Sequence, residues 1–111
     1  MSDRHTDPHL AVDYIIANAA KFAKAKAARV YLEEFRKSKK ALLMKASTES
    51  SGVAQERDAY AHPEYQELLA GLREAVEVEE RLKWDLIAAQ ARVEIWRTEQ
   101  ANARAEGRAT Q

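Results

Sequence analysis

The sequence predicts an all-α fold, an antiparallel hairpin of two long helices. Three observations support this fold class. Alanine supplies 22 of the 111 residues, and glycine and proline together supply only five, which favours long helices. No stretch alternates apolar and polar residues as a half-buried strand would. Turn-forming residues are concentrated in one segment, residues 47–52, which divides the chain into two helical parts.

Composition narrows the class of protein further. The chain has no cysteine, so it can form neither a disulfide nor a thiolate zinc site, and we expect a cytoplasmic protein. No apolar run approaches the roughly 20 residues that a membrane helix needs, and the first ten residues do not resemble a signal peptide. Basic and acidic residues balance at 18 each, so total charge indicates neither a nucleic acid nor a membrane as partner. We expect one domain, residues 1–111, without a cofactor.

The first helix is predicted to span residues 8–46. Asp7 reads as its N-cap and Pro8 as its first residue, where the missing N–H costs nothing; residues 1–7 should be flexible. An apolar stripe with one irregular spacing follows the helix and is expected to face its partner. The stripe consists of Ile16, Ala20, Ala23, Ala27, Tyr31, Phe35, Ser38 and Leu42.

A linker, residues 47–62, is expected next, with a possible short helical turn at 55–61. His62 and Pro63 repeat the start signal, which predicts a second helix over residues 63–103 and a flexible tail at 107–111. This helix carries an unbroken heptad seam with two polar exceptions, Glu79 and Gln100. The seam consists of Leu68, Leu72, Ala75, Glu79, Leu82, Leu86, Ala89, Val93, Trp96, Gln100 and Ala103.

Apolar residues remain outside these two stripes, and such surplus usually marks a surface for a partner. On the first helix they are Ile15, Phe22, Leu32 and Leu43. On the second helix they form a stripe far around the cylinder from the seam: Trp84, Ile87, Ala88, Ala91 and Ile95. We therefore expect a homo-oligomer that assembles through coiled-coil-like seams, with this second stripe as the interface.

Charge is unevenly divided between the helices. Residues 21–45 hold nine basic and two acidic residues, whereas residues 64–99 hold nine acidic and five basic ones. When the residues of the first helix are placed at about 100° per residue around its axis, several basic side chains fall within one arc of about 100°. It contains Lys26, Arg29, Arg36, Lys37 and Lys40, with Tyr31 beside it. The arc could bind the phosphates of a nucleic acid, and assembly of several copies of the chain would strengthen this binding. Alternatively, it is an exposed charged face or pairs with the acidic helix.

Other candidate sites are weaker. Asp3, His5, Asp7 and His9 alternate acid and imidazole but lack the spacing of a structural zinc site, so we expect no metal. Tyr60 and Tyr65 flank the linker and are expected to be exposed. The sequence has no glycine-rich phosphate loop and no nucleophile–base pattern. We expect no enzymatic activity and no small-molecule substrate.

Three segments carry a resemblance to a known family: Lys24–Met44, AYAHPEYQ (residues 59–66) and AQARVEIWRTEQANAR (residues 89–104). They resemble small helical proteins encoded by tailed bacteriophages, and their arrangement is similar to that of the UvsY-type recombination mediators. The resemblance implies an oligomer that binds single-stranded DNA and helps a recombinase displace a single-strand-binding protein. Lys26, Arg29 and Tyr31 match the basic and aromatic character of that family's first helix.

Two functional hypotheses follow. The first is a phage-type accessory protein of recombination or replication that binds single-stranded DNA through the basic arc and contacts a recombinase or single-strand-binding protein. The second is a non-enzymatic coiled-coil adaptor or scaffold, such as a small phage inhibitor of a host protein. In that case the stripe from Trp84 to Ile95 would bind another protein. Neither hypothesis involves a membrane.

Overall fold

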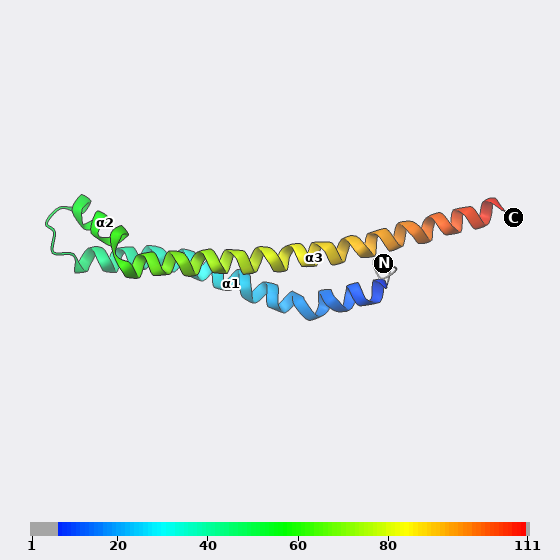
Figure 1. The fold of residues 1–111 in the computed structure, drawn as a ribbon, viewed down its shortest axis with the longest axis horizontal. Helices are drawn as coiled ribbons and strands as arrows, with labels where there is room; N and C mark the ends of the chain where they lie inside the picture. Colours follow the sequence, from blue (N-terminus) through cyan, green and yellow to red (C-terminus); the bar gives the residue numbers. More distant parts are fainter. Residues whose placement is uncertain (1–6, 111) are drawn as a thin grey trace. The chain divides into compact units, whose positions relative to one another are not determined.

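The computed structural model describes residues 7–110 and confirms the all-α fold class (Figure 1). Its helices are α1 (Pro8–Ala46), α2 (Gly52–Ala61) and α3 (Pro63–Ala109). The first helix has the predicted bounds, and the short linker helix is present. The predicted end of the second helix at residue 103 is wrong. The helix continues to Ala109 because its last residues are mostly alanine, arginine and glutamate, and a single Gly107 costs only about 1 kcal/mol.

Each helix begins where a side chain can cap it. The Asp7 carboxylate accepts a hydrogen bond from the His9 backbone N–H at 2.9 Å. The Ser51 hydroxyl accepts one from the N–H of Ala54 at 3.1 Å. His62 Nδ1 accepts one from the Glu64 backbone N–H at 3.1 Å, which confirms the predicted cap before Pro63. These bonds satisfy donors that a helix start leaves without an intrahelical partner.

The chain divides into two compact units. The first unit, Ala23–Glu80, contains the second half of α1, all of α2 and the first half of α3. Within it Lys39 pairs with Glu64, and Arg29, nearer the start of α1, pairs with Glu79, farther along α3. The two long helices therefore pack antiparallel in this unit, as the hairpin requires.

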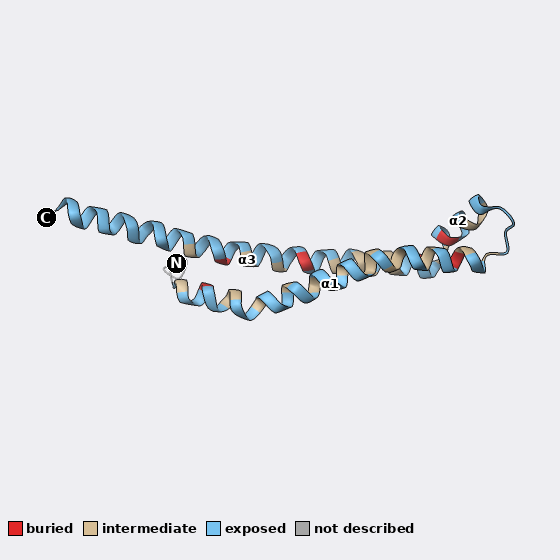
Figure 2. Ribbon diagram, turned by 180° about the vertical axis from the view of Figure 1, so that it is seen from behind, coloured by how far each residue is buried: buried red, intermediate tan, exposed pale blue. Residues whose placement is uncertain are grey.

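The core of this unit lies at its closed end, where α1, α2 and α3 meet (Figure 2). Leu43, Ala59 and Tyr65 are buried together there, and Met44 and Leu69 pack against them. Each helix contributes one of these three buried residues, so α2 covers the end of the hairpin formed by α1 and α3. The cluster is small, so much of the contact between the long helices must come from the seam.

The predicted seam of α3 is confirmed over most of its length. In the first unit its positions from Leu68 to Glu79 are buried or half-buried, and in the second unit those from Leu82 to Val93 are. From Glu94 to Ala109 every residue is exposed, including the predicted seam positions Trp96, Gln100 and Ala103. The last four turns of α3 therefore have no covering helix within the described part of the chain.

The predicted inward stripe of α1 is wrong. Ile16, Tyr31 and Leu42 belong to that stripe, and all three are exposed. The side that faces inward is a different one, with strictly alternating spacings of four and three. It consists of Ala11, Ile15, Asn18, Phe22, Ala25, Arg29, Leu32, Arg36, Lys39 and Leu43, and each is buried or half-buried. The apolar residues predicted to be surplus on this helix are thus the ones that pack.

The second unit contains the start of α1, up to Phe22, and α3 from Arg81 onward. Ala11 and Ala89 are buried in it, so the packed positions here are small residues. Partial burial, and then the carboxylate of Asp85 on α3, raise the pKa of the Tyr14 hydroxyl on α1. Among residues 7–110 no helix is long and apolar enough to cross a membrane. Residues 1–7 and 107–111 were expected to be flexible. Residues 1–6 and Gln111 lie outside the described residues, whereas residues 107–109 are the end of α3, so that part of the expectation is wrong.

Candidate protein-interaction surface

The basic arc of α1 does not form one exposed face. Lys26 and Lys37 are exposed, but Arg29, Arg36 and Lys40 are half-buried. The reason is geometric, because Arg29 and Arg36 belong to the inward stripe of α1 and Lys40 lies beside it. Most of the predicted arc therefore faces the acidic helices of the same unit.

Arg29 is the centre of an ionic cluster. Its Nη2 donates to Glu79 Oε1 at 2.9 Å, its Nε donates to Glu79 Oε2, and its Nη1 donates to Glu33 Oε2 at 3.1 Å. These hydrogen bonds, first those with Glu79 and then those with Glu33, raise the pKa of Arg29. Glu79 is only 7% exposed, so it is one of the most buried residues of the described chain. A two-point pair of this kind fixes the guanidinium firmly, which leaves it unsuited to binding a phosphate.

Two lysines at the closed end also have internal partners. Lys39 Nζ lies 2.7 Å from Glu64 Oε2, and this contact lowers the pKa of Glu64. Lys40 Nζ lies 3.5 Å from Glu56 Oε2 and 4.8 Å from the ring centre of Tyr60. The contact with Tyr60, and then Glu56, raises the pKa of Lys40 against the opposing effect of burial.

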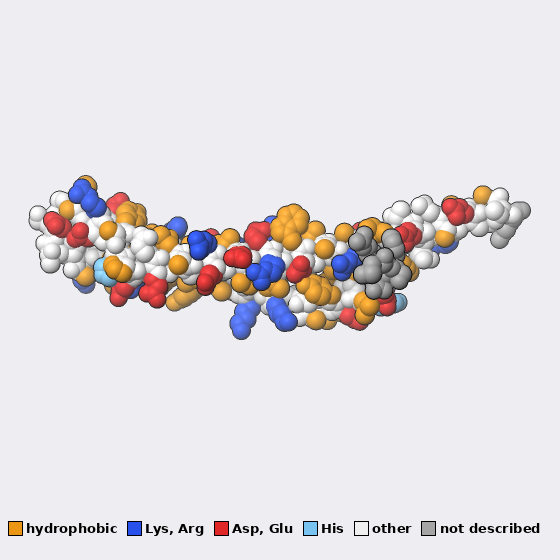
Figure 3. All heavy atoms as spheres, in the orientation of Figure 1, with side chains coloured by type: hydrophobic (Ala, Val, Ile, Leu, Met, Phe, Trp, Pro, Cys, Tyr) orange, Lys and Arg blue, Asp and Glu red, His pale blue; other side chains and the backbone are white. Residues whose placement is uncertain are grey.

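Total charge in this unit supports internal pairing. Residues 23–80 contain ten basic and eleven acidic residues, so the net charge is −1. Lys37 pairs with Glu34 on its own helix at 3.4 Å. Figure 3 shows blue and red side chains interspersed over the face in view. The uneven charge of the sequence is therefore largely balanced once the helices pack.

The aromatic residues divide between surface and core. Tyr31 is exposed and stacks on Phe35, with ring centres 5.8 Å apart. The expectation that Tyr60 and Tyr65 are both exposed is wrong for Tyr65, which is buried in the core at the closed end. The Tyr65 ring meets Tyr60 edge-on at 5.3 Å. A burial signal was present in the sequence, since Tyr65 lies three residues before the first position of the seam.

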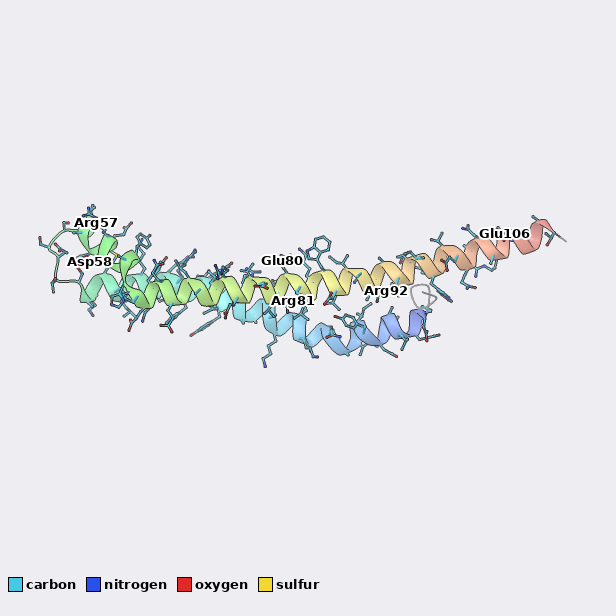
Figure 4. All side chains as sticks on the ribbon, viewed as in Figure 1. Arg57, Asp58, Glu80, Arg81, Arg92 and Glu106 are labelled. Atoms are coloured by element: carbon cyan, nitrogen blue, oxygen red, sulfur yellow. The ribbon has the colours of Figure 1, made fainter. Side chains whose placement is uncertain are left out.

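The two most exposed large apolar side chains of α3 belong to the stripe predicted as an interface. Trp84 is 60% exposed and Ile95 54%, and Ile87, Ala88 and Ala91 are exposed as well. At ~100° per residue this stripe lies roughly opposite the seam positions Leu82 to Val93. We call these five residues the outer α3 face. Asp85 and Arg92 flank it on one side; both are exposed, and Figure 4 labels Arg92.

The acid–imidazole pattern of the sequence does not form a metal site among residues 7–110. No group of three potential metal ligands occurs there, and Asp7, from the acid–imidazole pattern, caps α1 instead. Asp3 and His5 lie outside the described residues. A hollow of about 290 Å³ at the closed end is lined in part by Ser47, Asp58 and His62. The Ser47 hydroxyl donates to Asp58 Oδ2 at 2.6 Å and accepts from the Glu49 backbone N–H, so it stabilises the turn.

No protein-family model, no curated protein and no solved structure matches this chain. The resemblance to UvsY-type mediators therefore stays a prediction, and so does the phage origin that it implies.

Proposed function

We propose that this protein is a non-enzymatic coiled-coil adaptor or scaffold that acts by binding protein through the outer α3 face. The observation that carries the proposal is the exposure of Trp84 and Ile95 on the side of α3 turned away from its seam. Tryptophan is enriched among the residues that dominate the energy of protein interfaces. Here it lies one and a half heptads from an exposed isoleucine, with small residues between them.

The internal charge pairing supports a protein partner over a nucleic acid. A protein that neutralises several phosphates needs cations that are free to replace counterions. Arg29 and Lys40, two of the five cations in the predicted basic arc, are held by carboxylates from their own unit. Since this unit has a net charge of −1, it has no long-range attraction for a polyanion.

Site-specific photo-crosslinking in the source cells tests the proposal. A photoreactive phenylalanine analogue replaces Ile95 in one full-length variant and Gln90 in a matched control, because Gln90 is exposed on the same helix but off the face. We expect a discrete crosslinked protein product from position 95, weak or absent from position 90, and lost when Trp84→Glu is added. Equal products from both positions, or none from position 95, would refute the proposed function.

Single-stranded DNA binding is the second candidate. Its support is the exposure of Lys26, Tyr31 and Lys37, the three residues of the predicted DNA site that remain accessible. Fluorescence anisotropy with a labelled single-stranded oligonucleotide, measured across a salt series, decides between the candidates. The adaptor proposal predicts no binding even at low salt. Binding that weakens steeply with salt, with a shallower slope in Lys26→Ala, would favour the mediator instead.

A further inference from the structure

We infer that the partner of the outer α3 face is a second copy of this chain, packed antiparallel about a two-fold axis between Ala89 and Gln90. This inference rests on the proposed function, since it names the occupant of the same face. Two observations carry it: the order of side-chain sizes along the face, and the charges beside it.

The order of sizes suits antiparallel packing of two identical helices. Trp84, Ala88, Ala91 and Ile95 follow spacings of four, three and four, the pattern of a coiled-coil seam. A two-fold axis at the centre places Trp84 opposite Ile95 of the partner subunit and Ala88 opposite Ala91 of the partner subunit. The alanines then allow close approach in the middle, and the large side chains fill both ends. The arrangement is self-complementary, as a two-fold interface must be.

The flanking charges select the same arrangement. Asp85 and Arg92 lie one heptad apart on one side of the face, and antiparallel packing sets Asp85 opposite Arg92 of the partner subunit, twice in each dimer. Arg92 is exposed, so its guanidinium is accessible for this contact. The carboxylate of Asp85 contacts Tyr14 but can accept further hydrogen bonds. Parallel packing would instead bring Glu94 beside Glu99 of the partner subunit, which like charges oppose.

The face is short, so the dimer should be of moderate affinity. From Trp84 to Ile95 it extends ~17 Å along the helix, at ~1.5 Å per residue. Such a patch lies below the area of a standard stable interface, and we expect a dissociation constant on the order of micromolar.

Sedimentation equilibrium on the purified full chain tests the inference, at concentrations from about 1 to about 200 µM. We expect the mass to rise from the 12.6 kDa of one chain toward twice that value. Asp85→Arg and Arg92→Asp each place like charges opposite one another, so each alone should weaken self-association about tenfold or more. An equal mixture of the two variants restores opposite charges in both pairs and should regain the dimer mass.

Controls separate a lost interface from a lost fold. Asp13→Arg makes the same charge change at an exposed site on α1 and should leave the dimer unchanged. Arg92→Asp does not touch the Tyr14 contact, and Trp84→Gln weakens the face without altering charge. Circular dichroism should show unchanged helix content in all four variants; where one variant unfolds, the Trp84→Gln measurement still decides.

Two outcomes would overturn the inference: a monomer at every concentration, or variants whose mixture does not regain the dimer. A monomer that still gives a photo-crosslinked product with a different protein through position 95 would refute the second copy as occupant but support the proposed function. A monomer with no such product would refute both.

Discussion

Two adjacent leucines on α1 provide a sharp test of which side of this helix packs. Leu43 is 9% exposed and lies in the core at the closed end, whereas Leu42 is 59% exposed. Truncating each to alanine removes the same atoms from neighbouring positions of one helix, and alanine is an equally good helix former. Any difference in stability therefore reports packing.

The magnitude follows from the surroundings of Leu43. A buried leucine-to-alanine change costs about 2–5 kcal/mol, and the larger values occur where a rigid cavity remains. Leu43 borders the 290 Å³ hollow, so its site can be filled by water or by movement of Met44. We therefore expect a loss of about 2–3 kcal/mol in the free energy of unfolding, a fall of roughly 10 °C in Tm. Leu42→Ala should cost less than about 1 kcal/mol.

Thermal unfolding followed by circular dichroism at 222 nm (the α-helical band) measures both variants, with urea unfolding to test for a single cooperative transition. The reasoning fails if Leu42→Ala is as destabilising as Leu43→Ala. That result would indicate that the stripe predicted from the sequence, which contains Leu42, packs inward after all.

Three more predictions follow from the packing and the charges. Arg29→Gln should lower Tm by several degrees, because it removes the Arg29 guanidinium from the nearly buried Glu79. Lys37→Gln removes one partner of an exposed ion pair and should have little effect on Tm, and thermal melts of both variants measure the difference. The pKa of Glu64 is lowered in the folded protein, so its carboxylate stabilises the fold at pH values above 4.5, the ordinary pKa, and this contribution is lost as the pH falls through the lower pKa of the folded state. Between pH 7 and pH 3, Tm should therefore fall less steeply in Glu64→Gln than in the unchanged protein. Ala89→Leu should destabilise by about 1–3 kcal/mol through overpacking, and Ala101→Leu, at an exposed site on the same helix, should be nearly neutral in urea unfolding.

The hairpin and most of the seam of α3 could be predicted from the sequence because the relevant signals are local. Pro8 and Pro63 mark two helix starts, and each is preceded by a residue that caps it in the structure. The α3 seam is apolar apart from two positions, so a count of apolar spacings finds it. The end of α3 could not be placed because no proline or strong turn signal follows residue 103.

The inward side of α1 was missed because four of its ten positions are polar or charged. A search for apolar residues passes over Asn18, Arg29, Arg36 and Lys39, and so prefers a stripe with irregular spacing. A strict alternation of four and three, applied without regard to polarity, would have found the correct side. Glu79 also carried a signal, since an acid inside an apolar seam needs a cation across from it. That cation is Arg29, which the sequence placed in a DNA-binding arc.

The pair between Arg29 and Glu79 also limits how the two long helices can slide past each other. A shift of seven residues would preserve most apolar contacts of α3 but would bring Leu72 or Leu86 opposite Arg29 in place of Glu79. Either slipped form would place the Arg29 guanidinium against apolar side chains and separate it from the nearly buried Glu79, so both charges would lose free energy through desolvation. Helices with a repeating apolar pattern can pair during folding in several alignments that differ by one heptad and have similar apolar contacts. A single misplaced charge is enough to make the incorrect alignments short-lived.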